Sequence, residues 1–303
     1  MQYLNKVIMN SRIITLICFS FLSIQIFAQV EGIVINKEIN TPIPYANIWI
    51  ANKDIGTTSD TDGSFHLKDT LNIDTIVVTA IGYEKTYFQI DSSYVVVALE
   101  PKTYQIPEVR VTPGSNDEIV VGRFKRSQIH SVVCPGRPQI YARFFQFKEE
   151  YGTNATIKSI KFPTLSMTKA KINLRIFNVN ARGEPGDDIL SYNYLITINK
   201  GKNMNRVELP YETNTFFPEK GIFIAFEFLI IKENEYLPPR YKDLTGKIVK
   251  NKGDLIGYMP AMGLQRSASP VNYWIYDKGK WLKNSLKEKS IYEDLAIELT
   301  LSH

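Results

Sequence analysis

Short apolar segments of β type recur along this chain, separated by turn residues, and no long stretch has helical periodicity. In the first third, residues 43–51 alternate in side-chain character and residues 76–80 form an apolar, β-branched run, as in strands buried on at least one face. Many short strands at such spacing are typical of β-sandwiches. Later in the chain the expected strands are 140–147, 156–162, 172–179, 191–198, 205–209, 221–229, 255–259, 273–276 and 294–301.

Turn residues separate these segments. Residues 59–64 combine short oxygen side chains with a glycine, which predicts a tight hairpin. Asp60 and Asp62 also resemble the start of a calcium loop, but the later Asp or Glu ligands of such a loop are absent from the sequence, so the turn is the favoured interpretation. Residues 181–188 are expected to form a loop, and residues 277–279 are expected to turn a hairpin.

The N-terminus has the pattern of an export signal. Lys6 and Arg12 precede an apolar run over residues 13–22, and Ala28 offers a small residue for cleavage. The run is too short for a membrane span, which takes about 20 mostly apolar residues. We therefore expect residues 1–28 to be removed, with an uncleaved anchor as the alternative.

Composition and charge limit the classes of partner. Removing the signal lowers the net charge from +5 to +3 and leaves Cys134 as the one cysteine, so no intrachain disulfide is expected. Basic and acidic residues are interleaved, which indicates neither a nucleic-acid stripe nor a patch for anionic membranes. The hydrophobic content of 44% is sufficient for two domains. Pro, Gly and small polar residues predict a linker at residues 112–118.

Two resemblances refine the domain organisation. Residues 30–34, 41–50, 56–67 and 74–84 resemble the carboxypeptidase-regulatory-like domain, which implies a transthyretin-like β-sandwich that acts as an accessory and carries no catalytic residues. A looser resemblance, to the jelly-roll domains of exported bacterial surface proteins that resemble carbohydrate-binding modules, rests on residues 171–179, 183–186, 207–210 and 221–227.

The expected fold is therefore all-β, with two sandwich domains. Its parts are a signal peptide at 1–28, a carboxypeptidase-regulatory-like β-sandwich at 29–111, a linker at 112–118 and a jelly-roll-like β-sandwich at 119–303.

Catalytic motifs are absent from the sequence. His66, His130 and His303 lack the His-x-x-Glu of a zinc peptidase, and no Gly-x-Ser-x-Gly elbow is present. We interpret Cys134 as a buried small hydrophobe rather than a nucleophile. No catalytic residue, metal ion or cofactor is expected.

Two glutamates define the alternative, an enzyme. Glu227 and Glu298 each lie between apolar neighbours, so strand alternation points both away from the core, toward solvent or a groove. Two carboxylates at a suitable separation would make a glycan hydrolase.

Aromatic residues gather in the last quarter of the chain. Tyr273 and Trp274 are adjacent, so they face opposite sides of a strand and at least one of them lies outside the core. Flat rings with a polar edge suit stacking on sugars or packing at a protein interface. The ligand-binding candidates are Tyr273, Trp274, Tyr276 and Trp281.

These features predict an exported, non-catalytic accessory protein of a Gram-negative cell envelope, located in the periplasm or at the outer membrane or cell surface. The expected partner is a glycan or an envelope protein, and no nucleic acid. The alternatives are an envelope glycan hydrolase and a purely structural or assembly component. Association with an outer-membrane component stays open.

Overall fold

A computed structural model of the chain places most of its residues after the expected signal. It describes residues 29–68, 75–102, 118–133, 135–152, 154–210, 216–242, 245–253, 255–267, 273–284, 287–288 and 291–302. The expected signal, residues 112–117 of the expected linker, Cys134 and His303 lie outside the described residues.

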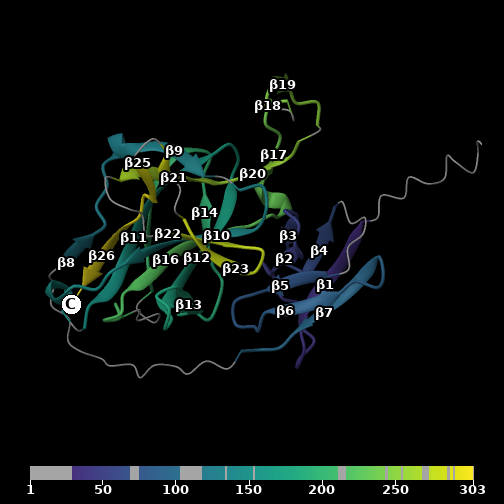
Figure 1. The fold of residues 1–303 in the computed structure, drawn as a ribbon, viewed down its shortest axis with the longest axis horizontal. Coiled ribbons are helices and arrows are strands. Elements are labelled where there is room, and N and C mark those ends of the chain that lie inside the picture. Colours follow the sequence, from purple (N-terminus) through teal and green to yellow (C-terminus); the bar gives the residue numbers. More distant parts are fainter. Residues whose placement is uncertain are drawn as a thin grey trace, which may run out of the picture.

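The first domain is a sandwich of two small sheets (Figure 1). Parallel pairing of β1 and β7 and antiparallel pairing of β1 and β4 form one sheet. The other sheet has the order β3-β2-β5-β6. The strands are β1(Val30–Asn36), β2(Asn47–Ile50), β3(Gly56–Thr58), β4(Ser64–Leu67), β5(Thr75–Thr79), β6(Thr86–Gln89) and β7(Tyr94–Leu99). Between the sheets lies a core that includes Val34, Ile48, Leu67 and Val97.

The turn at residues 59–63 forms as expected, but it does not close a hairpin. Asp62 Oδ1 accepts a hydrogen bond of 2.9 Å from the Ser64 N–H, and Gly63 adopts a φ of 77°. The strands on either side belong to different sheets, since β3 pairs with β2 and β4 pairs with β1. Ser59 directs this change of sheet, because its buried hydroxyl donates to the Ile43 carbonyl and accepts from the Ala46 N–H.

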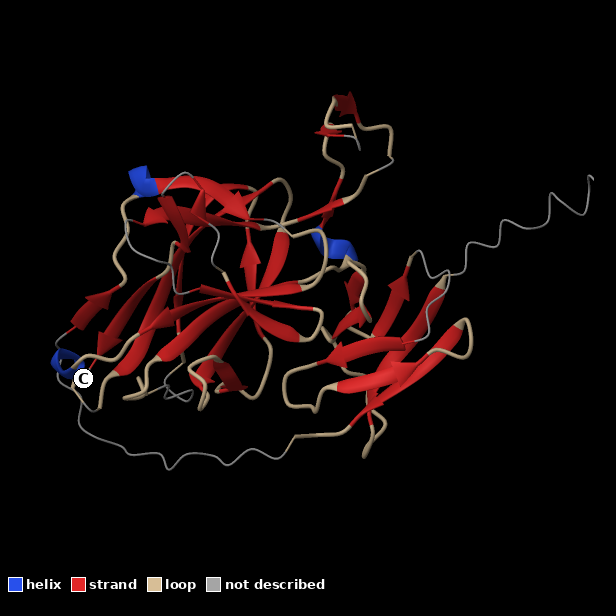
Figure 2. Cartoon of the chain, in the orientation of Figure 1, coloured by secondary structure: helices blue, strands red, loops and turns tan. Residues whose placement is uncertain are grey.

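The second domain is a larger sandwich, so the all-β expectation is confirmed (Figure 2). A seven-stranded sheet has the order β13-β12-β16-β10-β22-β23, with β14 also paired to β12. Its strands are β10(Gln139–Phe145), β12(Ala170–Val179), β13(Pro185–Asp188), β14(Tyr194–Ile198), β16(Ile222–Phe228), β22(Tyr273–Asp277) and β23(Lys280–Lys283).

An eight-stranded sheet faces it, in the order β24-β25-β21-β11-β26-β8, with β15 on β11 and β9 on β21. Its strands are β8(Glu118–Val121), β9(Ile129–Val133), β11(Thr156–Ser166), β15(Gly201–Glu208), β21(Ala261–Ser267), β24(Lys287–Glu288), β25(Ile291–Leu295) and β26(Glu298–Ser302). The two sheets meet in one large core, where the rings of Phe162 and Phe226 lie 4.3 Å apart.

Two strands differ from expectation. β11 continues past residue 162 through Pro163, which has no N–H to donate. The proline lies where β11 changes partner, from β26 at Lys161 to β21 at Thr164. Residues 181–188 are not entirely a loop, because β13 pairs with β12.

A slender arm, residues 235–258, projects from the second domain (Figure 1). It consists of a stalk, β17(Glu235–Tyr236) paired with β20(Gly257–Tyr258), and a tip, β18(Arg240–Lys242) paired with β19(Ile248–Lys250). The helices among the described residues are three-residue 3₁₀ turns, η1(Arg126–Gln128), η2(Glu149–Tyr151) and η4(Lys232–Asn234). None of the helices in this part of the chain could therefore cross a membrane.

Candidate functional site at the junction of the two domains

The outer face of the seven-stranded sheet is unusually apolar. Along β16, Ile224 and Phe226 enter the main core, whereas Phe223 and Ala225 join a separate cluster on the opposite face. The strand register adds Ile140, Ala142, Phe144, Phe177, Trp274, Tyr276 and Trp281 to that cluster. Glu227 shares this outer face, as strand alternation predicts.

The first domain covers one end of this face. In β2, Ile48 and Ile50 belong to the core of the first domain, so Asn47 and Trp49 project from its other side. Trp49 is fully buried, its Nε1 donates to the Pro138 carbonyl at 3.0 Å, and its ring meets Tyr276 edge-on at 5.7 Å. The sheet of the first domain that contains β2 therefore packs on the seven-stranded sheet through side chains that belong to neither sandwich core.

A buried charged cluster lies at the centre of the junction. Arg175 donates to Glu227 Oε1 at 3.0 Å and to both oxygens of Asp188 at 2.7 and 2.6 Å. Asn173 donates to Glu227 Oε2 at 2.7 Å, and Asn47 of the first domain donates to Oε1. Burial lowers the pKa of Arg175, but the two carboxylates outweigh burial and hold that pKa above its ordinary value.

Glu227 therefore does not face solvent or a groove, which corrects that expectation. Its exposed fraction is 1%, because the first domain and β12 enclose the carboxylate. Three nitrogen donors satisfy it, so it acts as an acceptor that fixes the junction rather than as a carboxylate with access to water.

Ion pairs continue the junction toward the surface. Arg137 makes a two-pronged contact with Asp277 at 3.1 and 2.8 Å, and it lies 3.6 Å from Asp54 of the first domain. Lys278 reaches the same Asp54 at 2.6 Å, and Lys85 donates to the Gly279 carbonyl at 3.2 Å. The β22–β23 turn is thus held against the first domain.

The other border of the junction consists of apolar contacts and a hydrogen bond from a backbone N–H. Tyr45 of the first domain packs with Leu229 and Ile231, just after β16. Thr58 accepts a 3.0 Å hydrogen bond from the Ile230 N–H through its hydroxyl.

Comparison with protein families identifies the first domain. Residues 30–111 match the CarboxypepD_reg-like domain family. The first domain is a CarboxypepD_reg-like domain. A comparison with curated proteins gives no match.

Among solved structures, the chain is similar to the cysteine protease Cwp84 of Clostridium difficile. A form after propeptide cleavage aligns at 11% identity and a TM-score of 0.38, covering 82% of this chain and 50% of the other. A structure of its cysteine protease and lectin-like domains aligns at 12% identity and a TM-score of 0.38, covering 82% and 45%. The chain thus spans about half the length of these proteins. Scores this low do not establish a shared fold.

The four predicted ligand-binding aromatics occupy different environments. Tyr273 belongs to the main core, with 4% exposure, and burial raises its pKa. Tyr276 lies between Trp49 of the CarboxypepD_reg-like domain and Trp281, whose ring is 5.0 Å away. Trp274, the outward member of the adjacent pair, packs at 6.5 Å from Phe223 and stays half-buried.

The two glutamates do not form a pair. Glu298 lies on β26 of the eight-stranded sheet, where it accepts a 3.0 Å hydrogen bond from Lys161, whereas Glu227 belongs to the seven-stranded sheet. In the described part of the chain, His66 contacts Glu31 at 3.2 Å, and no group of His, Cys, Asp and Glu side chains could hold a metal ion.

Sequence analysis missed Asn47, Asn173 and Arg175 as partners of Glu227, and it missed Asp188 as the second carboxylate bound to Arg175. A signal was present, since Asn47, Asn173 and Arg175 each interrupt an apolar strand. A pocket of about 400 Å³ on the eight-stranded sheet was also missed. Its lining includes Arg126, Val132, Pro163, Lys202 and Met204.

Proposed function

We propose that this chain is an exported, non-catalytic binding protein of the bacterial cell envelope. The CarboxypepD_reg-like domain acts as a rigid accessory, and the second domain contacts a glycan or an envelope protein. Export is supported by Lys6, Arg12 and the apolar run that follows them.

The observation that carries the proposal is the aromatic edge, formed by Trp274, Trp281 and Lys283. Both indoles belong to the outer-face cluster and both stay half-buried. Trp281 lies beside Tyr276 at the border of the junction, whereas Trp274 packs against Phe223. Lys283 is exposed and holds its ammonium 6.0 Å from the centre of the Trp274 ring. An indole flanked by a cation offers a flat stacking surface and a hydrogen-bond donor, which suits a sugar ring or a protein interface.

Retention on purified peptidoglycan, cell-wall polysaccharide and envelope protein extract tests this proposal. We expect Trp274→Ala to weaken retention on the matching material by about 1–3 kcal/mol, the range of interface aromatic anchors, without unfolding the protein. Tyr94→Ala is the control, because Tyr94 is 57% exposed on β7, in the sheet of the CarboxypepD_reg-like domain that does not contain Trp49.

Equal retention of both variants would contradict the proposal. Sustained hydrolysis of a polysaccharide by the purified protein, abolished by Glu298→Gln, would replace it with the hydrolase alternative.

A further inference from the structure

The arm at residues 235–258 packs its strands only with one another. β17 pairs with β20 and β18 pairs with β19, and neither two-stranded sheet includes a strand from elsewhere in the described chain. Figure 1 shows the tip standing clear of both sandwiches. An isolated two-stranded hairpin of this size is marginally stable by itself, so a binding partner would stabilise the arm.

The tip gathers cations on one face. Arg240 lies directly opposite Lys250, and Lys242 lies opposite Ile248 on the same face. Like charges at directly opposed positions destabilise a β-ribbon. No ion pair joins Arg240, Lys242 or Lys250 to an acidic residue within the part of the chain that the structure describes. The arrangement therefore suits an anionic partner.

The cationic cluster at the tip is not apparent from the linear sequence. Asp243 and Asp254 are interleaved with the cations of the arm, so the charge pattern looks balanced along the chain. The hairpin register is what brings Arg240, Lys242 and Lys250 together.

Large aliphatic side chains accompany these cations. Leu237, Ile248 and Leu255 are 65%, 63% and 41% exposed. Cations beside exposed aliphatic side chains are the composition of elements that lie in a membrane interface, where the cations meet headgroups and the aliphatics enter the acyl boundary.

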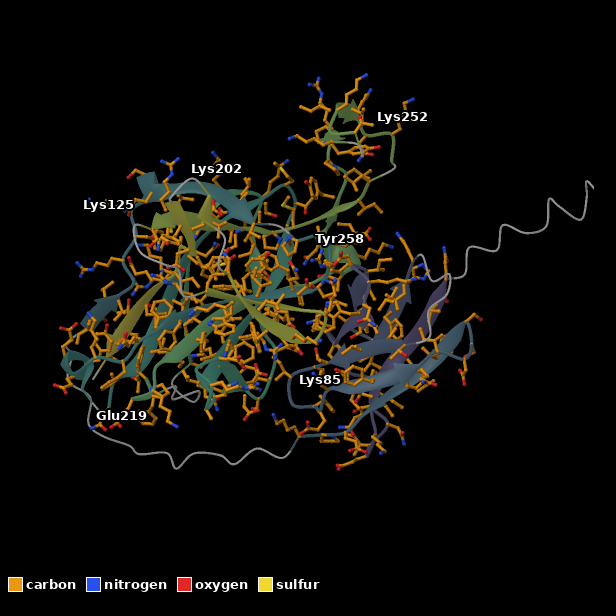
Figure 3. The ribbon with its side chains drawn as sticks, viewed as in Figure 1. Lys85, Lys125, Lys202, Glu219, Lys252 and Tyr258 are labelled. Atoms are coloured by element: carbon orange, nitrogen blue, oxygen red, sulfur yellow. The ribbon has the colours of Figure 1, made fainter. Side chains whose placement is uncertain are left out.

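Further cations lie on the same side of the molecule. Figure 3 places Lys125, Lys202 and Lys252 along the side from which the arm projects, whereas Lys85 and Glu219 lie toward the opposite side. Arg126 and Lys202 also line the pocket on the eight-stranded sheet. A planar surface of repeated anions could contact the projecting tip without matching its shape, whereas a protein partner would need a complementary groove.

We propose that the arm docks the protein on the anionic headgroups of a lipid bilayer. Arg240, Lys242 and Lys250 contact phosphate groups, and Ile248 and Leu237 enter the boundary below them. This contact is independent of the aromatic edge, which lies on another surface and has its own test.

Vesicle co-sedimentation tests the inference, with the full chain as processed by the producing cell. The probes are vesicles of phosphatidylcholine alone and vesicles that also contain phosphatidylglycerol. We expect binding to the anionic vesicles, and we expect Arg240→Gln/Lys242→Gln/Lys250→Gln to weaken it at least about tenfold at moderate salt. The matched control, Lys68→Gln/Arg182→Gln/Lys220→Gln, removes the same charge from exposed sites outside the arm and should bind like the wild type.

A second variant separates the aliphatic contribution from charge. Leu237→Ser/Ile248→Ser should weaken binding to anionic vesicles while keeping its salt dependence. Equal losses in the triple variant and its control would overturn the inference, as would equal binding to neutral vesicles. Retention on an acidic protein matrix without binding to anionic vesicles would instead assign the arm to a protein partner.

Discussion

Glu227 shows how a single acidic residue can join two domains. Glu227 is 1% exposed, and its carboxylate accepts hydrogen bonds from Asn47, Asn173 and Arg175 in place of water. Removing this carboxylate leaves Arg175 paired with Asp188, but it takes away the acceptor of buried amide N–H groups of Asn47 and Asn173. An unsatisfied buried donor costs about 1–3 kcal/mol, so we expect Glu227→Ala to lower the free energy of unfolding by about 3 kcal/mol, measured by urea denaturation.

Glu298 provides the comparison at the same scale. Strand alternation predicts the same outward orientation for Glu298 and Glu227. The ion pair of Glu298 with Lys161, however, borders solvent and lies within the second domain. Glu298→Ala should cost about 1 kcal/mol or less. Equal losses in the two variants would contradict the burial argument.

Asp294 carries a pH dependence. Burial raises its pKa above the ordinary 3.8, although Arg143 at 3.1 Å and the Leu295 N–H both oppose that rise. Burial likewise lowers the pKa of Arg143. The unfolded chain thus loses its Asp294 proton first as pH rises, so the stability that protonated Asp294 contributes is present below pH 3.8 and is lost as pH rises through the folded pKa.

The measurement is the stability difference between the wild type and Asp294→Asn as a function of pH. As pH falls from about 7 toward about 4, we expect the free energy of unfolding of the wild type to increase relative to that of Asp294→Asn. A change in the opposite direction would mean that the Arg143 pair, rather than burial, governs Asp294.

At the scale of elements, the tight turn of the β22–β23 hairpin also packs against the first domain. Lys278 and Gly279 adopt φ values of 50° and 77°, the backbone of a two-residue hairpin turn in which both central residues have positive φ. A Cβ added at Gly279 would lie 3.1 Å from a methyl carbon of Val77 in the CarboxypepD_reg-like domain. Gly279→Ala should therefore cost about 1–2 kcal/mol from the backbone, with a further loss from the displaced contact.

Gly183 offers a matched control. Its φ is 78°, yet a Cβ there would meet nothing within 4 Å. Gly183→Ala should show the backbone loss alone in thermal denaturation. If the two substitutions cost the same, the turn does not press on the other domain.

Local patterns predicted elements better than they predicted the relations between elements. The strands at 172–179 and 221–229 were expected because apolar alternation marks them, and the 277–279 turn because its residues favour positive φ. The sheet change at residues 59–63 depends on Ser59 bonding to distant backbone, which no local pattern encodes. The arm was missed because its three-residue strands are too short to show periodicity.

The junction could not be predicted from sequence for a related reason. The alternation over residues 43–51 predicted burial of at least one face of β2, but both faces are buried, and the residue that bonds to Trp49 lies about 90 positions away, at Pro138. The β22–β23 hairpin brings Tyr276 and Trp281 together, but Tyr273 lies in the main core and Tyr276 contacts Trp49, a residue far away in sequence.

At the scale of the whole molecule, two sandwiches with separate cores share one interface. Trp49 belongs to neither core, so its ring contributes to the association of the domains and not to the packing within either one. Cleavage within residues 112–118, where the sequence predicts a linker, should therefore yield two fragments that stay together.

Trp49→Ala tests whether this interface holds the molecule together. The substitution removes the edge-on contact with Tyr276 and the hydrogen bond to Pro138, at a cost of about 3–5 kcal/mol to the association of the domains. After limited proteolysis, the wild-type fragments should elute together in size-exclusion chromatography, and the Trp49→Ala fragments should separate while each keeps its β-type circular dichroism. Tyr94→Ala, in the other sheet of the same domain and 57% exposed, should behave like the wild type. Separation of the wild-type fragments would mean that the linker, and not the buried face around Trp49, joins the domains.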